Sequence, residues 1–150
     1  MLTITVDDRA FRSYLAELQG RLTDLTPVMQ SIGQELEGRI SARFETESDP
    51  MGLAWHPWAQ STIDSYPPDG NHRILDRHSP GAASLLGSLS WQADASSVRV
   101  GFGQRYATFH EFGTKHMPRR GLLFADPDAG TIAPGDERMV IELLEEWLVP

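Results

Sequence analysis

His110-Glu111 is the pair of residues that most suggests chemistry, because zinc proteases place two histidines and a glutamate on one helical turn. That motif needs its second histidine four residues after the first, but Thr114 stands there and the next histidine is His116. The remaining histidines show no ligand-like spacing; they are His56, His72 and His78. Packing or a hydrogen bond therefore explains His110 better than metal binding. A metal-dependent hydrolase built on His110, Glu111 and His116 is kept as an alternative.

Other catalytic signatures are missing from the sequence. Gly101-Phe102-Gly103 is followed by no third glycine and no Gly-Lys-Ser/Thr, so it does not resemble a phosphate-binding loop. No serine lies in a Gly-x-Ser-x-Gly motif, and the absence of cysteine excludes disulfides, thiolate zinc sites and cysteine nucleophiles. We expect no catalytic residues, no metal and no cofactor, and hence a protein that is not an enzyme.

The charged residues limit the partners of the chain. Its 13 Lys and Arg against 21 Asp and Glu give a net charge of -8, which disfavours tight DNA binding. One dense basic patch, Lys115, His116, Arg119 and Arg120, interrupts this acidic background. Three roles of the patch stay open. It serves solubility, or it pairs with an acidic neighbour such as another copy of the chain. Contact with DNA is the least favoured of the three.

Two tryptophans, Trp55 and Trp58, lie in a long segment rich in proline and glycine, residues 46–80. Each indole has a large apolar surface that is costly to leave in water. The segment therefore either folds onto the core of its own chain or docks on a partner. We select Trp55, Trp58 and the basic patch as candidate interface residues.

The N-terminal part predicts a strand and two helices. Alternating residues indicate a short strand over 2–6, and a helix with apolar residues from Phe11 to Leu25 then begins at Asp7 or Asp8. Thr26-Pro27 supplies a capping hydroxyl and a first-turn proline for a second helix. Its apolar stripe is Val28, Ile32, Leu36, Ile40 and Phe44. We expect the two helices to form an antiparallel pair that packs on a sheet.

The later part predicts further elements around a small sheet. A helical turn over 60–65, a hairpin from 88–91 and 98–102, and a short helix over 106–113 ended by Gly113 are expected in that order. The faces of the short helix that carry Tyr106, Phe109 and Phe112 are expected in the core. A strand over 117–124 and a helix from Pro134 follow. With 40% hydrophobic and 23% charged residues, the chain fits a single globular domain over 1–150. The predicted elements place this domain in the α+β class. No apolar run is long enough to predict a membrane span.

Three stretches together resemble the phage virion morphogenesis family, which includes tail completion proteins of Mu-like and P2-like phages. The first runs from Gly52 through Trp55 and Pro57 to Thr62, and the second comprises Ile74-Leu75-Asp76, residues 85–91 and residues 98–101. The third is the most diagnostic and includes Tyr106, Ala107, His110, Phe112, Gly113, Pro118 and Arg119. The chain departs from the pattern at Trp58, at Glu111, where glutamine is common, and in an extended insert around residues 78–81.

The resemblance implies a structural protein of a phage or phage-like particle. It would complete the tail or join head and tail as a tail terminator or head–tail connector, in a ring of identical copies that is often six-fold. Partners would be further copies of itself and adjacent tail-tube, portal or neck proteins, with DNA at most passing through the lumen. Its place would be the virion, and the host cytoplasm during assembly. A transient assembly factor that leaves the finished particle is the second alternative.

Overall fold

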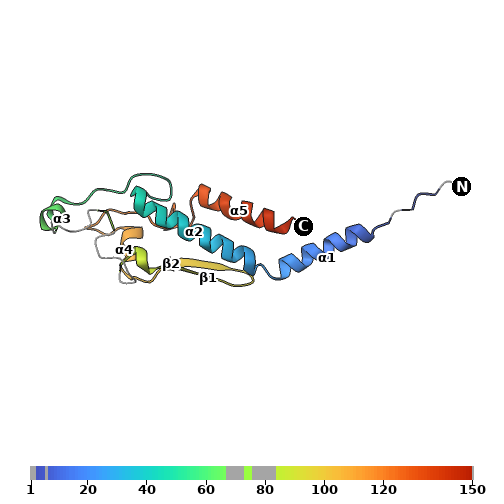
Figure 1. Cartoon of the computed structure of the whole chain (residues 1–150). Helices are drawn as coiled ribbons and strands as arrows, with labels where there is room; N and C mark the ends of the chain where they lie inside the picture. Colours follow the sequence, from blue (N-terminus) through green and yellow to red (C-terminus); the bar gives the residue numbers. More distant parts are fainter. Residues whose placement is uncertain (1–2, 6, 67–72, 76–83, 150) are drawn as a thin grey trace.

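In the computed structural model, three layers cross the body of the molecule (Figure 1). The structure describes residues 3–5, 7–66, 73–75 and 84–149. The central layer is α2 (Thr26–Thr46); the hairpin of β1 (Leu89–Ala93) and β2 (Val98–Phe102) covers one side of it, and α5 (Pro134–Leu148) covers the other (Figure 1). The shorter helices are α3 (Gln60–Ser65), α4 (Ala107–Phe112) and the 3-10 turn Leu86–Ser88. This arrangement confirms the α+β class.

Helix α2 forms because its sequence supplies one continuous apolar stripe after a favourable start. Val28, Ile32, Ile40 and Phe44 are each at most 3% exposed, as their four-residue spacing predicts. Pro27 lies in the first turn, where its missing N–H costs nothing. The expected hydroxyl cap is wrong in detail, because Asp24 Oδ1 accepts the Thr26 N–H instead, at 3.0 Å.

The hairpin is held in register by its turn and by contact with α2. Leu89 pairs with Phe102 and Trp91 with Val100, which places alternate side chains on the α2 side. The Trp91 indole lies against Gly33 of α2, where a Cβ atom would come within 2.5 Å of the ring, and its Nε1 donates to Glu37 at 2.7 Å. Only glycine at position 33 allows this close approach.

The core is centred on the C-terminal half of α2. Its buried apolar cluster comprises Ile40, Phe44, Trp55, Leu85 and Leu122. The Phe44 and Trp55 rings meet edge to face, with centroids 5.4 Å apart. Trp55 is 5% exposed, so this part of the long segment folds onto its own core, the first of the two possibilities that the sequence left open.

Helix α1 (Arg9–Thr23) does not form the expected antiparallel pair with α2. It continues beyond the end of α2, away from the body, and packs on the C-terminal end of α5 (Figure 1). Arg21 fastens it there: Nη1 donates to the Trp147 carbonyl at 2.7 Å, and the guanidinium lies over the Trp147 ring. The predicted helix pair is wrong because the sheet is only a two-stranded hairpin, and α2 alone covers its face.

Two predicted strands are also wrong. Residues 3–5 have no regular structure, while Leu2 and Val6 lie outside the described residues. Residues 117–124 make only an isolated bridge, Thr114 to Met117, because side chains take the backbone groups that a ladder would need. The insert around 78–81, together with His72 and His78, lies outside the described residues. Among the helices that are described, none has the length and apolarity to cross a bilayer.

Candidate functional site

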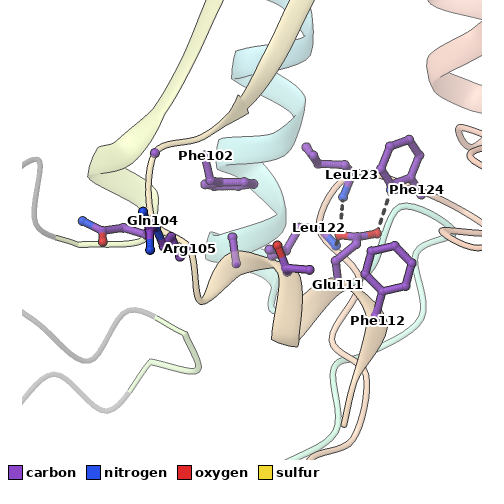
Figure 2. A pocket seen from close by; sticks show the side chains of 11 residues that line it. Phe102, Gln104, Arg105, Glu111, Phe112, Leu122, Leu123 and Phe124 are labelled. Carbon is purple, nitrogen blue, oxygen red and sulfur yellow. Dashed lines mark hydrogen bonds between the residues drawn. The ribbon is translucent and has the colours of Figure 1, made fainter.

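The segment that follows α4, residues 119–124, is folded around one buried carboxylate, that of Glu111 (Figure 2). Its Oε2 accepts the N–H groups of Leu122 at 2.7 Å and Leu123 at 2.9 Å, and Oε1 accepts that of Phe124 at 3.0 Å. Three successive backbone donors thus converge on a side chain that is 5% exposed. Hydrogen bonds to an ionised acceptor are stronger than neutral ones, so this carboxylate fixes the path of the segment.

The two arginines at the start of this segment anchor it through their guanidinium groups. Arg119 Nε donates to the Glu111 carbonyl at 2.7 Å, and its Nη2 donates to the Phe124 carbonyl at 2.6 Å. Arg120 turns the opposite way and donates to the carbonyls of His56 at 2.8 Å and Pro57 at 2.9 Å. Both guanidiniums therefore tie loops together within the monomer.

Two further side chains, Trp55 and Arg43, connect this segment to the core. Trp55 Nε1 donates to the Gly121 carbonyl at 2.9 Å, and Arg43 Nη1 donates to the Leu122 carbonyl at 2.7 Å. Arg43 also pairs with Asp136 at the start of α5, and both side chains are buried. A Cβ atom at Gly121 would lie 2.7 Å from the Arg119 guanidinium, so a larger residue there would require that side chain to shift. Residues 119–124 are thus joined to α2, α4 and α5.

An apolar hollow of about 280 Å³ opens beside this segment (Figure 2). We call it the α4 groove; its walls come from the end of β2, from α4 and from residues 122–124. Its apolar lining is Phe102, Ala107, Phe112, Leu122, Leu123 and Phe124, with Arg105 and Gln104 at one side. Phe112 is 49% exposed and Phe109, on the same helix, is 55% exposed, contrary to the expected core position of both rings.

A second cavity, of about 660 Å³, lies between the Trp58 loop and α4. Trp58 is half-buried there and stacks on Tyr66 with ring centroids 4.7 Å apart. His110 lines the same cavity and meets the Tyr106 ring edge to face. Burial, and then the positive charge of Arg120, lowers the pKa of His110, so its imidazole is neutral at pH 7.

The sequence model of the phage virion morphogenesis family matches residues 6–149, almost the whole chain. The chain belongs to the phage virion morphogenesis family. Its role therefore lies in phage morphogenesis, as part of or in association with the virion. No curated protein and no solved structure matches the chain.

Several residues that carry the family pattern contact the segment 119–124 or lead into it. Gly52 turns with φ +83° before Trp55 enters the core, and Pro57 supplies a carbonyl to Arg120. Gly113 ends α4 with φ +71°, and a Cβ there would lie 3.0 Å from the Arg119 nitrogen. The remaining pattern residues lie on α3, on α4 or directly before or after α4: Thr62, Tyr106, Ala107, His110, Phe112, Pro118 and Arg119.

The six candidate interface residues of this family member are placed very differently. Trp55 and Arg120 are interior, at 5% and 8% exposed, so neither side chain is offered to a partner. Trp58 and Arg119 are half-buried, and Lys115 and His116 are exposed. The structure thus narrows the candidate interface to Lys115, His116 and the edge of Trp58, which remains a prediction.

Sequence reasoning missed the central role of Glu111. Its carboxylate oxygens are taken by backbone N–H groups and Arg119, which leaves them poorly suited to act as a base or metal ligand. In the described part of the chain, no three His, Asp or Glu side chains gather in a way that could hold a metal ion. The available signal was the departure from the expected pattern at this position, where glutamate supplies two acceptor oxygens.

Proposed function

We propose that this member of the family is a structural ring component that completes the tail or joins head and tail. Copies of the chain contact one another and an adjacent tail-tube, portal or neck protein, and six copies are the expected number. The observation that carries the proposal is that large apolar side chains stay exposed at two separate places, on α1 and on α4, in a member of a phage morphogenesis family. Phe11, Leu22, Phe109 and Phe112 are all between 49% and 63% exposed. Large apolar side chains that stay exposed along a helix face are typical of protein–protein contacts.

The rigid attachment of residues 119–124 supports a structural role. The backbone of the segment is hydrogen-bonded by Glu111, Arg43 and Trp55 from outside it and by its own Arg119. These bonds fix its conformation. A preorganised surface loses little conformational freedom when it binds, which favours repeated identical contacts. Head-to-tail contacts of identical subunits close into a ring when the rotation between neighbours closes.

The composition of purified particles tests this function. A tail completion or connector ring is expected in finished particles at a fixed number of copies, measured by quantitative mass spectrometry against the tail-tube protein. Absence of the chain from finished particles made with its help would instead establish the transient assembly factor. A chain that is dispensable for particle formation would refute both.

A charge reversal tests the narrowed interface. Lys115→Glu is expected to lower the yield of complete particles, because the exposed ammonium faces an acidic neighbour in the ring. Arg99→Glu is the matched control, since Arg99 is an exposed cation on the hairpin. Both variants should retain the circular dichroism spectrum of the wild type. Equal yields from the two variants would remove Lys115 from the interface.

A metal-dependent hydrolase is the alternative function, and assays of metal content and activity test it. Because Glu111 is held by three backbone donors, we propose that no turnover depends on the pair His110 and Glu111. Elemental analysis of the purified protein, followed by hydrolase assays with the metal found, tests this. Turnover that disappears in His110→Ala while the fold is retained would overturn the structural role.

A further inference from the structure

The apolar stripe of α1 is uncovered in the isolated chain. Phe11, Leu15 and Leu22 are 63%, 44% and 53% exposed, and no residue of this helix is buried. An isolated helix of 15 residues is marginal in water, and most helical stability comes from burying such a stripe. Arg21 attaches only the last turn to α5, so the rest of the helix lacks a partner surface in the described chain.

The α4 groove is the apolar site that this stripe fits, but it lies at the far end of the same molecule. Leu122, in its wall, is bonded to Arg43 near the C-terminal end of α2, whereas α1 joins the N-terminal end. The 21 residues of α2 separate these ends by about 30 Å. Helix α1 also points away from the body (Figure 1). In this conformation, only the α1 of another molecule can reach the groove.

The two surfaces match in polarity and charge. The groove offers apolar walls with Phe112 half exposed at its edge, and Arg105 lines one side. The three arginines of α1 are each paired with a nearby carboxylate, so this helix adds no excess charge of its own. The C-terminal half of α5, which lies beside α1, exposes three acidic side chains, Glu142, Glu145 and Glu146, and no basic one. An approaching α1–α5 end is therefore attracted to Arg105 while the leucines of the stripe enter the groove.

We infer that α1 of one copy docks in the α4 groove of the next, so that each subunit gives a helix to one neighbour and receives one from the other. This contact is heterologous, since two different surfaces of identical chains meet, and it repeats around a closed ring. The inference rests on the proposed ring function and names the surfaces that build the ring.

Cross-linking between single-cysteine variants tests the contact, because the natural chain has no cysteine. One variant carries Leu15→Cys on the stripe, and the other carries Thr108→Cys, at an exposed position that lines the groove. Mixed and treated with a short bismaleimide, they should form the mixed dimer in preference to either homodimer. Ser13→Cys, on the opposite face of α1, is the control and should cross-link to Thr108→Cys about tenfold less.

Other products would overturn the inference. Dimers of Leu15→Cys alone would show that α1 pairs with α1. Cross-linking within one chain of the Leu15→Cys/Thr108→Cys double variant would show that α1 folds back on its own groove. Absence of the mixed product from the two cysteine variants, together with a wild-type protein that stays monomeric, would also refute docking. In that case the fixed copy number in particles could still hold, so failure of the contact and failure of the ring function are distinguishable.

A charged residue on the stripe gives an independent readout. Leu15→Glu is expected to weaken self-association at least about tenfold in light scattering, because it places a carboxylate in the apolar groove. Ser13→Glu adds the same charge to the polar face and should leave self-association unchanged. Equal association of the two variants would remove the stripe from the contact.

Discussion

Replacing Glu111 by alanine tests the central feature of the site. The change leaves three backbone N–H groups, those of Leu122, Leu123 and Phe124, without their acceptor. An unsatisfied buried donor costs roughly 1–3 kcal/mol. The lower half of that range applies here, because Leu122 is buried but Leu123 and Phe124 are half-buried and water can reach them. The free energy of unfolding should therefore fall by roughly 3–6 kcal/mol.

Thermal and urea unfolding followed by circular dichroism measure this loss. For a chain of 150 residues, each kcal/mol lowers Tm by about 2–4 °C, so a fall of roughly 6–24 °C is expected. Glu111→Gln keeps one acceptor oxygen but turns an NH₂ group toward the other donors, and it should lose roughly half as much. Glu146→Ala, which removes an exposed glutamate from α5, is the control and should change stability by less than about 0.5 kcal/mol. A loss below about 1 kcal/mol for Glu111→Ala would refute the role assigned to the carboxylate.

Three further predictions follow from the same packing. Gly33→Ala should destabilise the fold by roughly 1–3 kcal/mol, since its Cβ would overlap the Trp91 ring. Gly38→Ala, which has open space around it, should instead stabilise the fold by up to about 1 kcal/mol. Urea unfolding of both variants measures the two changes. Burial lowers the pKa of His110 below its unfolded value near 6.5, so the unfolded state binds the proton more readily and stability should fall as pH drops from 7 to 5. His110→Gln should flatten this dependence of stability on pH, and an unchanged dependence would contradict the lowered pKa of His110. Arg120→Ala should expose the backbone of residues 56–59, and hydrogen exchange no faster there than in the wild type would argue against its two carbonyl bonds.

The structure also changes what a tryptophan experiment can show. A double change of Trp55 and Trp58 to alanine would have tested the interface if both rings were on the surface. Because Trp55 packs on Phe44 and donates to Gly121, its loss is expected to unfold the core, with a cost of roughly 3–5 kcal/mol. Loss of particles from that variant would therefore say little about assembly, and Lys115→Glu is the sharper test.

Elements with a complete local signal were predictable from the sequence. The stripe of α2, the alternation of the hairpin and the glycine that ends α4 each depend on side chains close in sequence. The family pattern was also readable, because it consists of residue types in order. The hydrogen bonds that hold residues 119–124 were not predictable, since Glu111, Arg43 and Trp55 are 11 to 79 residues away in the sequence from the groups they bond. Residues 117–124 were predicted as a strand because the distant side chains that fold this segment give no local signal.

The sequence alone determined α2, the hairpin, α5, the α+β class and the family, since all of these follow from short-range spacing and residue type. Only the tertiary structure decided where those elements face. It turned Arg119 and Arg120 from a surface patch into internal ties, buried Trp55 and left the stripe of α1 in water. The physical reason is that a hydrogen-bonding or apolar side chain specifies that it needs a partner but not which one. That choice depends on which surfaces the folded chain has left uncovered.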